Sequence, residues 1–564
     1  METIRLALVQ ANTITGDLKG NTEKIIRYIK KARDAEVDIV TFPELAVTGF
    51  PPEGLLSMPD FIDQNINCFN TIIKETAGIT AVVGFVDRQR RFLFNAAAVI
   101  HDGKLVCIYH KRSLYPCLFN EPFYFCKGED NRFFELNGLR FTVNIGADCL
   151  VDNIVESQTM GGAEFILNIS GAPFFLDEAE DINTLILRKA ALYKAGISVT
   201  NHVGGQNELV FGGRSIIANN KGDLILKADA FKEEFLYMDL DCNSFIGERN
   251  SKMRDESPLI VLPPINNKRN KAYISPSLPI KPSSPPIGEL FEALKLGLGD
   301  YVRKSGFHKV TVGLSGGIDC SLVAALAVSA LGNDNVIGIS MPSQYTSHES
   351  MEDAELLAQN LKINILTIPI NSLFESFMNL FNPLFSGMPP DITEENLQSR
   401  IRGTILMSIS NKFGWLVLST TNRSEANTGY CTLYGDSVGG FAAIKNVPKH
   451  VVYSLSEYLN EISGKTVIPL RVFEKEPTAE LRPNQKDSDS LPPYNILDPI
   501  LEAYLCENKS ISEIAKSGGY NEALVINTIK MVNNSEYKRR QCPPGIRLFK
   551  KNDRLPLTSK LDWL

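Results

Sequence analysis

Three polar residues in the first half of the chain have side chains that can perform amide chemistry together. Glu44 follows the apolar run VDIVTFP, Lys111 follows LVCIYH, and Cys149 follows LRFTVNIGAD. A thiolate attacks an amide carbonyl, a carboxylate carries the proton, and a lysine stabilises the oxyanion and lowers the pKa of the thiol. Each residue alone also fits an ordinary structural role, because buried cysteines and solvated charges are common. The three together predict a hydrolytic site.

A glycine-rich loop in the second half predicts an anion site. The segment KVTVGLSGGIDCS, residues 309–321, runs from a strand-like pattern through glycines into a helix-like pattern. Glycines let backbone N–H groups approach an anion, and a helix N-terminus adds partial positive charge. The loop matches neither GxxxxGK[ST] nor GxGxxG, so it is not a Walker-type or dinucleotide loop. SGG alone equally fits a plain turn in which Asp319 or Ser321 caps the helix.

The elements that must position these residues differ between the two halves. Up to about residue 265, short apolar runs are closed by polar turns, with helical stretches between them. This mixture predicts a layered α+β or α/β domain. Strands are expected at 4–9, 37–42, 81–86, 139–145, 165–169 and 197–200, helices at 21–36 and 182–195, and hairpin turns at 101–104 and 219–223.

The second half alternates regularly between strand-like and helix-like patterns. Such alternation predicts a parallel sheet with helices on both faces. Thr420 and Glu425 follow the last expected strand, at the carboxyl edge where ligands bind in such sheets. A helix-start cap is the structural alternative for Glu425. Strands are expected at 308–314, 336–340, 363–368 and 415–419, and helices at 290–304, 319–331, 351–361 and 396–413.

A proline-rich segment separates the two halves. Residues 263–286, PPINNKRNKAYISPSLPIKPSSPP, carry seven prolines and no helical or strand period. This composition predicts a linker, and an ordered strap across the surface is the alternative. The predicted domains are therefore 1–262 and 287–564, with the linker 263–286 between them.

The composition argues against several other classes of protein. The 564 residues include 44% hydrophobic and 22% charged residues, as in ordinary globular proteins of more than one domain. The formal net charge of −7 argues against a generally basic nucleic-acid-binding surface. Ten cysteines without a CxxC pair argue against a zinc site and a disulfide scaffold. No signal-peptide pattern is found, and the most apolar run, 322–331, is too short to span a bilayer, so we expect a cytoplasmic protein.

Longer motifs in the second half resemble the synthetase domain of the NAD synthetase family. SGGIDCS resembles the SGGxDS pyrophosphate loop of enzymes that transfer AMP, with Cys320 where that family usually has serine. The resemblance covers nearly all of 286–550 and implies a Rossmann-like parallel α/β domain of the SGGxDS adenine-nucleotide hydrolase type. The other motifs are MPSQYTSHESMEDA (341–354), NLQSRIRG (396–403), STTNRSEANTGYCTLYGDSVGGFAAIKNVPK (419–449), KEPTAELRPNQKDSDSLPPYNILD (475–498) and EYKRRQCPPG (536–545).

This resemblance implies roles for particular residues in a synthetase site. Asp319 and Glu425 match the Mg²⁺ ligands. Lys445 is a further candidate near the nicotinate carboxylate, with a solvated surface lysine as the alternative. The positions implied to bind deamido-NAD are Asn396, Arg400, Glu425 and Lys538. The residues implied to bind ATP are Gly313, Leu314, Ser315, Gly316, Gly317, Ile318, Asp319, Cys320, Ser321 and Thr420.

The first half resembles the nitrilase-like amidase family over roughly residues 1–260. The resemblance is carried by FPELAVTGF, YHKRSLYP, NISGAPF and NHVGGQNELVFGG. It implies a four-layer α-β-β-α sandwich in which Glu44, Lys111 and Cys149 are the catalytic residues. The positions that depart from the family pattern, and that predict an altered glutamine pocket, are Cys117, Leu150, Ala172 and Glu178.

The order of the two halves resembles the glutamine-dependent NAD synthetases. This implies that ATP adenylates deamido-NAD with release of pyrophosphate, and that ammonia released from glutamine then displaces AMP. ATP and Mg²⁺ are the implied cosubstrate and cofactor, a homo-oligomer is expected, and neither nucleic acid nor membrane is an expected partner. One alternative is an ammonia-dependent NAD synthetase with an altered or regulatory amidase half. Another is a regulatory or scaffolding protein, which wide separation of Glu44, Lys111 and Cys149 would favour.

Overall fold

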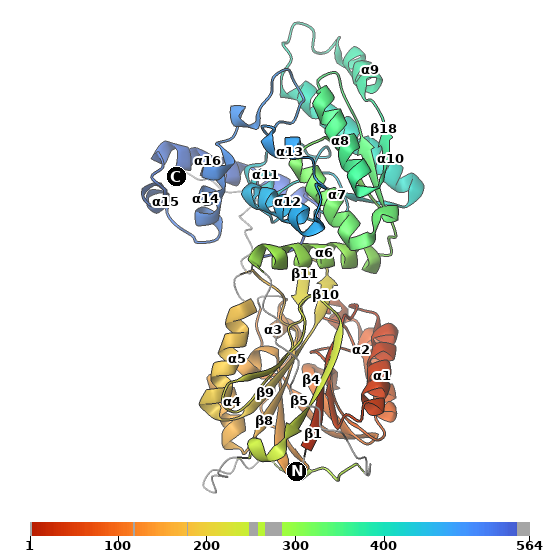
Figure 1. Ribbon diagram of the computed structural model, residues 1–564, viewed down its shortest axis with the longest axis vertical. Coiled ribbons are helices and arrows are strands. Elements are labelled where there is room, and N and C mark those ends of the chain that lie inside the picture. Colours follow the sequence, from red (N-terminus) through yellow and green to blue (C-terminus); the bar gives the residue numbers. More distant parts are fainter. Residues whose placement is uncertain (1–2, 117–118, 177–178, 247–257, 266–284, 550–564) are drawn as a thin grey trace. The chain divides into compact units, whose positions relative to one another are not determined.

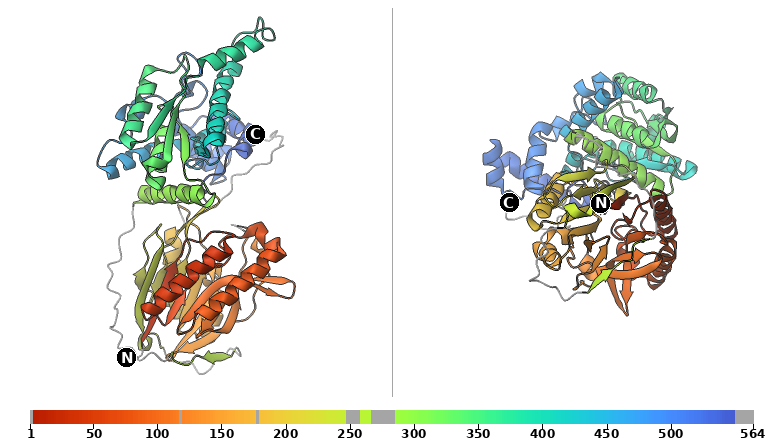
Figure 2. Two further views of the ribbon diagram at one scale, coloured as in Figure 1. Left: turned by 90° about the vertical axis from the view of Figure 1, so that its right-hand side faces the viewer. Right: turned by 60° about the horizontal axis from the view of Figure 1, so that its bottom comes forward.

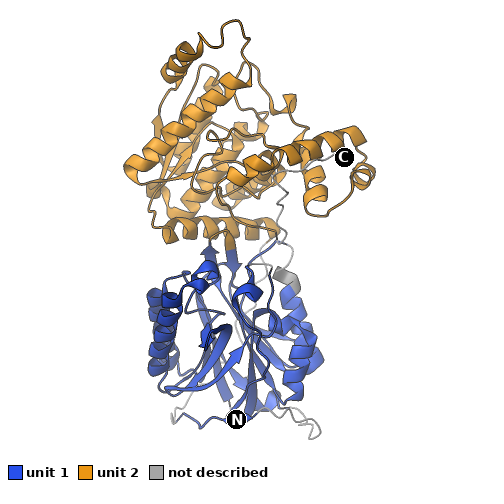
Figure 3. Cartoon of the chain, turned by 180° about the vertical axis from the view of Figure 1, so that it is seen from behind, with its two compact units in different colours: residues 1–206, 210–283 blue, residues 207–209, 284–564 orange. Residues whose placement is uncertain are grey.

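The chain forms two compact units, which Figure 3 shows in different colours. The structure is a computed structural model that describes residues 3–116, 119–176, 179–246, 258–265 and 285–549. The first unit comprises residues 1–206 and 210–283, and the second comprises 207–209 and 284–564. No helix in the described ranges has both the length and the apolarity needed to cross a membrane.

Two mixed sheets form the framework of the first unit. One sheet has the strand order β14-β1-β2-β3-β4-β5, and the other has the order β13-β12-β9-β8-β7-β6-β15. The strands of the first sheet are β1 (Thr3–Gln10), β2 (Ile39–Thr41), β3 (Thr80–Gln89), β4 (Phe92–His101), β5 (Lys104–His110) and β14 (Glu234–Asp241). Those of the second are β6 (Phe133–Leu136), β7 (Leu139–Ile145), β8 (Phe165–Ser170), β9 (Gly196–Asn201), β12 (Ile216–Ala218), β13 (Leu224–Lys227) and β15 (Leu259–Val261). A separate ribbon consists of β10 (Val203–Gln206) and β11 (Leu209–Gly212).

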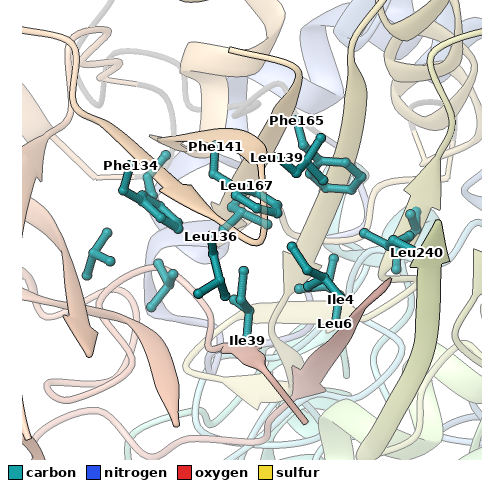
Figure 4. Packing of buried hydrophobic residues seen from close by; sticks show 14 of the residues in the cluster. Ile4, Leu6, Ile39, Phe134, Leu136, Leu139, Phe141, Phe165, Leu167 and Leu240 are labelled. Carbon is teal, nitrogen blue, oxygen red and sulfur yellow. The ribbon is translucent and has the colours of Figure 1, made fainter. Parts of the chain in front are cut away.

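The main hydrophobic core of the first unit lies between these two sheets. Because side chains alternate along a strand, Ile4, Leu6 and Leu8 of β1 share one face. They belong to the same buried cluster as Phe134 of β6 and Phe141 of β7. Figure 4 shows residues from both sheets in this cluster. Burial of apolar surface, worth about 25 cal/mol per Å², therefore holds the two sheets face to face.

Helices cover the outer face of each sheet, which completes an α-β-β-α sandwich (Figures 1 and 2). The alternate side chains of β1, such as Val9, pack with Ile25 and Ile29 of α1. Asp17 caps α1 by accepting a hydrogen bond from the Gly20 N–H at 2.9 Å. The helices are α1 (Leu18–Asp34) and α2 (Pro59–Glu75) on the first sheet, and α4 (Asp152–Met160) and α5 (Ala179–Tyr193) on the second. Shorter elements are α3 (Glu121–Tyr124) and the 3₁₀ turns η1 (Glu53–Ser57), η2 (Gly146–Leu150) and η3 (Cys242–Ser244).

A four-stranded parallel sheet organises the second unit. Its order is β18-β17-β16-β19, and β16 pairs in parallel with both β17 and β19. The strands are β16 (Val310–Gly313), β17 (Val336–Ser340), β18 (Asn364–Thr367) and β19 (Leu416–Leu418). The longer helices are α6 (Pro286–Lys304), α7 (Ile318–Leu331), α8 (His348–Leu361), α9 (Asn371–Phe381), α10 (Ile392–Phe413), α12 (Lys449–Ser463), α14 (Tyr494–Leu505) and α16 (Glu522–Asn534). The shorter ones are α11 (Arg423–Thr428), α13 (Leu470–Glu474), α15 (Ile511–Gly518), α17 (Glu536–Gln541), η4 (Asn333–Asn335) and η5 (Asp487–Asp489).

The fold class expected from the sequence is confirmed in both units, as are the two hairpin turns. β4 and β5 meet at 102–103, and β12 and β13 meet at 219–223. The sequence analysis did not anticipate several elements, among them α2, β4 and β14 of the first unit. Most of the predicted linker, at 266–284, lies outside the described residues, and α6 begins at Pro286.

Gly84 of β3 makes a close backbone approach that generates a stability prediction. A Cβ atom at this position would lie 2.4 Å from the Pro43 carbonyl oxygen and 2.5 Å from the Leu45 nitrogen. These backbone atoms cannot move aside without distorting the chain around Glu44. We therefore expect Gly84→Ala to lower the free energy of unfolding by about 1–3 kcal/mol. Gly54→Ala is the matched control, because a Cβ atom there meets open space. Equal melting temperatures for the two variants would contradict this prediction.

Candidate active sites

A buried cluster of charged and amide side chains lies at the strand ends of the first unit. Lys111 Nζ, directly after β5, lies 2.7 Å from Glu44 Oε1 and 2.8 Å from Glu121 Oε1. The Asn95 side chain of β4 donates to both carboxylates, at 2.7 and 3.2 Å. All four residues are buried. The structure thus brings together two of the three residues predicted from the sequence, Glu44 and Lys111.

The Gly171 backbone and the His202 side chain, which follow two strands of the second sheet, help to fix the position of Glu44. The Gly171 N–H, after β8, donates to Glu44 Oε2 at 2.9 Å. His202 Nε2 lies 2.6 Å from the Glu44 carbonyl oxygen. Glu44 is therefore held by groups from both sheets of the sandwich, and its carboxylate has little rotational freedom.

The carboxylates of this cluster keep Lys111 ionised. Burial on its own lowers the pKa of Lys111, but the charges of Glu44 and Glu121 outweigh burial, and the pKa is raised. Burial raises the pKa of Glu121, while Lys111 opposes this shift. The ammonium group therefore stays protonated and remains available to stabilise negative charge.

Cys149 lies on η2, the turn that also carries Gly146 past the charged cluster. A Cβ atom at Gly146 would lie 2.7 Å from Glu44 Oε2 and 3.3 Å from Lys111 Nζ, so this turn closely approaches both side chains. Cys149 itself is 1% exposed and packs with Val155 of α4 and Ile166 of β8. Burial raises the pKa of the thiol to about 12, although Lys189 and Asn144 lower it. The lowered thiol pKa expected from the sequence is therefore wrong for this state.

A chain of buried amides supports the Cys149 turn. Asn144 hydrogen-bonds the Cys149 side chain and donates to Gln158 Oε1 at 3.1 Å. Asn168 donates to Asn144 Oδ1 at 2.8 Å and to the Gly146 carbonyl oxygen at 3.0 Å. Asn144 Oδ1 already accepts a hydrogen bond from Asn168, and the contact of Asn144 with Cys149 lowers the pKa of the thiol. The side-chain N–H group of Asn144 is therefore the donor toward sulfur.

The residues expected to alter the glutamine pocket are only partly described. Ala172 donates its backbone N–H to Asn201 at 3.0 Å and offers no side-chain hydroxyl. The guanidinium of Arg112, the residue after Lys111, contacts Asn131 at 2.9 Å and Ser157 at 3.2 Å. Cys117 and Glu178 lie outside the described residues.

The glycine-rich loop of the second unit borders a cavity of about 270 Å³ at the carboxyl end of the parallel sheet. Gly316 has a φ of +79°, and a Cβ atom there would lie 2.3 Å from the Ser350 carbonyl oxygen. Only glycine fits that position. Of the residues predicted to bind ATP, those that line the cavity are Gly313, Leu314, Ser315, Gly316, Gly317, Ile318, Asp319, Cys320 and Thr420. Ser321 does not line it; its hydroxyl donates to the Gly317 carbonyl oxygen at 2.7 Å.

A buried lysine joins the two predicted metal ligands. Lys449, the first residue of α12, is 3% exposed. Its Nζ hydrogen-bonds Asp319 and lies 3.3 Å from Glu425 Oε1. Burial alone lowers the pKa of Lys449, but these two carboxylates outweigh it and the pKa is raised. Burial and the charge of Asp319 raise the pKa of Glu425 to about 8. All three side chains line the cavity.

Three of the four remaining predicted side chains contact residues 428–436. This stretch begins at the last residue of α11 and is called the 428–436 segment below. Asn396 accepts from the Thr432 hydroxyl at 2.7 Å, and Arg400 donates to the Leu433 carbonyl oxygen at 3.3 Å. Lys538 Nζ donates to the carbonyl oxygens of Gly429 and Cys431, both at 2.8 Å. Lys445 instead donates to the Pro543 carbonyl oxygen at 2.8 Å. None of these four predicted side chains lines the described cavity.

Four contacts were missed by reasoning from the sequence alone. Glu121 pairs with Lys111, and Asn95 and Asn144 lie inside strands whose apolar pattern hides them. Lys449 follows proline at a helix start, where a lysine is usually solvated. The one available signal was a polar residue in an otherwise buried run, as in FLFNAAAVI and LRFTVNI.

The folds and sites define the class of protein. A buried carboxylate–lysine pair beside a cysteine turn on an α-β-β-α sandwich defines a carbon–nitrogen hydrolase unit. A glycine-rich anion loop at the carboxyl edge of a parallel sheet defines a nucleotide-dependent unit. The chain is thus a two-unit enzyme.

Comparisons with known proteins agree with this class. A family model for carbon-nitrogen hydrolase matches residues 5–247, and one for NAD synthase matches residues 290–542. Glutamine-dependent NAD(+) synthetases of Thermotoga maritima and Aquifex aeolicus are 41% and 43% identical, with 99% of each chain covered. The structure of the Acinetobacter baumannii glutamine-dependent NAD+ synthetase in complex with ADP is similar at 34% identity and a TM-score of 0.77, covering 98% of this chain and 97% of that one. The chain belongs to the glutamine-dependent NAD(+) synthetase family.

The contact between Asn144 and Cys149 generates a prediction about the reactivity of the amidase unit. We expect Asn144→Ala to lower kcat/KM for glutamine hydrolysis about tenfold or more, because a hydrogen bond to a charged group is worth about 1.5–3 kcal/mol. Because the lost donor favours the thiolate, alkylation of Cys149 by a glutamine-like electrophile at a fixed pH is expected to slow as well. Asn67→Ala on exposed α2 surface is the control. An unchanged alkylation rate would show that Asn144 does not act on the thiol.

Proposed function

We propose that this chain converts deamido-NAD to NAD with ATP, and that its first unit supplies the nitrogen from glutamine. The observation that carries this proposal is the presence of both a paired Glu44–Lys111 cluster and a loop-lined nucleotide cavity in one chain. The full-length relatives are named as glutamine-dependent, which favours this function over the ammonia-only alternative. The 2.7 Å contact between Glu44 and Lys111 also argues against a scaffolding protein.

In the amidase step, Cys149 is the proposed nucleophile. Because the raised pKa keeps its thiol protonated, deprotonation accompanies attack on the glutamine amide, and Glu44 accepts the proton. Protonated Lys111 stabilises the oxyanion. Glu44 then returns the proton to the leaving nitrogen, ammonia departs, and water hydrolyses the thioester to glutamate.

In the synthetase step, the nicotinate carboxylate of deamido-NAD attacks the α-phosphorus of ATP, and pyrophosphate leaves. The backbone N–H groups of the loop and the N-terminus of α7 are suited to hold the phosphates. Lys449 adds a fixed positive charge to the same cavity. Ammonia then attacks the acyl-adenylate carbonyl carbon, and AMP leaves. The proposed deamido-NAD contacts are Asn396, Arg400, Glu425 and Lys538.

The donor set of the cavity fits Mg²⁺. Asp319 and Glu425 offer hard carboxylate oxygens, and the raised pKa of Glu425 indicates that Lys449 alone does not balance the two acids. Within the described residues no cluster of three His, Cys, Asp or Glu side chains forms a metal site, so phosphate oxygens and water would supply the other ligands of a bound ion. Bound Mg²⁺ would neutralise phosphate charge during adenylation. The homo-oligomeric state and the cytoplasmic location remain predictions.

Removing the nucleophile separates the two half-reactions. We expect Cys149→Ala to abolish NAD synthesis supported by glutamine, while synthesis supported by ammonium stays near wild type. The experiment compares NAD formation with the two nitrogen donors, and Cys68→Ala on α2 is the control for loss of a thiol in the same unit. Equal loss with both donors would indicate that Cys149 has a structural role instead.

Removing either proposed metal ligand is expected to impair NAD synthesis with both nitrogen donors and to spare glutamine hydrolysis. We expect Asp319→Asn and Glu425→Gln to reduce NAD synthesis at least a hundredfold with either donor, since adenylation precedes nitrogen transfer and depends on phosphate charge neutralisation worth several kcal/mol. Glutamine hydrolysis measured alone is retained. Asp334→Asn, at an exposed acid of the same unit, is the control. Ammonium-supported synthesis near wild type in both variants would overturn the metal assignment.

A further inference from the structure

Two cysteines that the proposed function does not use meet beside the 428–436 segment. Cys431 belongs to this segment, and Cys542 is the residue directly after α17. Both thiols are free and half-buried, and their side chains hydrogen-bond to each other. They are far apart in the sequence, so the fold brings them together.

The backbone around the two thiols is held by contacts that do not involve sulfur–sulfur bonding. Lys538 of α17 donates to the carbonyl oxygens of Gly429 and Cys431. Ser535 donates to the Thr428 carbonyl oxygen at 2.8 Å. The Cys542 thiol in turn lies 3.4 Å from the Lys538 carbonyl oxygen. The meeting of Cys431 and Cys542 is therefore a preset feature of this unit.

The hydrogen bond between the two thiols, together with the nearby charges, lowers the pKa of one and raises the pKa of the other. The hydrogen bond from Cys431 lowers the pKa of Cys542 to about 7 against the effect of burial. Lys445 and Arg539 also lower this pKa, and Asp436 raises it. The hydrogen bond to Cys542, together with burial, raises the pKa of Cys431. Thiolate is the nucleophilic form, so Cys542 is the attacking residue near neutral pH.

We propose that Cys431 and Cys542 are an oxidant-sensitive dithiol, and that hydrogen peroxide converts it to a disulfide which inhibits NAD synthesis. The Cys542 thiolate attacks a peroxide oxygen, the O–O bond breaks, and hydroxide leaves to take up a proton as water. The Cys431 thiol then attacks the resulting sulfenic acid sulfur and displaces a second water. Two thiols lose two electrons and two protons, and the peroxide is reduced to two waters. A dithiol reductant reverses the change by exchange.

The consequence for activity follows from what the 428–436 segment contacts. Tyr430, Gly435 and Asp436 line the nucleotide cavity. Thr432 and Leu433 hold the side chains of Asn396 and Arg400. A disulfide needs an S–S separation of about 2.05 Å and a restricted dihedral angle, so its formation must pull the segment toward α17.

The test uses the full chain, treated with hydrogen peroxide and then with dithiothreitol. Peptide mapping is expected to find a Cys431–Cys542 cross-link that dithiothreitol removes. Ammonium-supported NAD synthesis is expected to fall at least fivefold on oxidation and to recover on reduction. The nitrogen donor is ammonium because oxidation of Cys149 then does not affect the result. Only the activity measurement rests on the proposed function; the cross-link is measured independently of it.

Two variants and one control make the outcome specific. Cys542→Ser and Cys431→Ser are each expected to resist inhibition by peroxide, and Cys431→Ser is expected to accumulate a sulfenic acid at Cys542 that a cyclic 1,3-diketone traps. Cys506→Ser, which keeps an acceptor for the Arg423 guanidinium, is expected to remain as sensitive as wild type. Failure to form the cross-link overturns the proposal, as does full activity of the cross-linked protein. Persistent inhibition of both pair variants also overturns it, because another thiol would then be responsible.

Discussion

A buried ammonium group between two carboxylates is the arrangement on which both units depend. Lys111 lies between Glu44 and Glu121, and Lys449 lies between Asp319 and Glu425. Each charge loses hydration on folding, and this cost is offset only while its partners stay in place. Removing one partner of such a buried pair typically costs about 3–5 kcal/mol. The strands and turns that carry these residues are therefore constrained more tightly than their own hydrogen bonds require.

Close backbone packing maintains these constraints. Gly84 and Gly171 lie against the residues around Glu44, and Gly316 lies against Ser350 at the mouth of the nucleotide cavity. A side chain at Gly84 or Gly316 would push the functional loop away by steric contact with main-chain atoms. Rigid placement of the reacting groups lowers the reorganisation needed during the reaction.

The sequence reveals these sites to the extent that their signals are local. Glu44, Lys111 and the loop 313–320 each follow an apolar run, and periodicity identifies where a strand ends. Fold class was predictable for the same reason, since alternation of strands and helices is a local pattern. Glu121 and Lys449 were not identified as charge partners, because nothing near them in the sequence specifies which distant carboxylate or lysine they will meet. The state of the Cys149 thiol was misjudged because its burial depends on helices α4 and α5, and burial outweighed the nearby positive charge.

The enclosure of Cys149 affects how this protein appears in chemical proteomics. A side chain that is 1% exposed, with a pKa raised to about 12, reacts slowly with small, unselective alkylating reagents. Broad cysteine-profiling experiments will therefore score Cys149 as unreactive, and a covalent inhibitor found by such screening will mark other thiols of the chain. Selective probes for this residue need the shape of an amide substrate, so that the electrophile reaches sulfur through the same contacts that position glutamine.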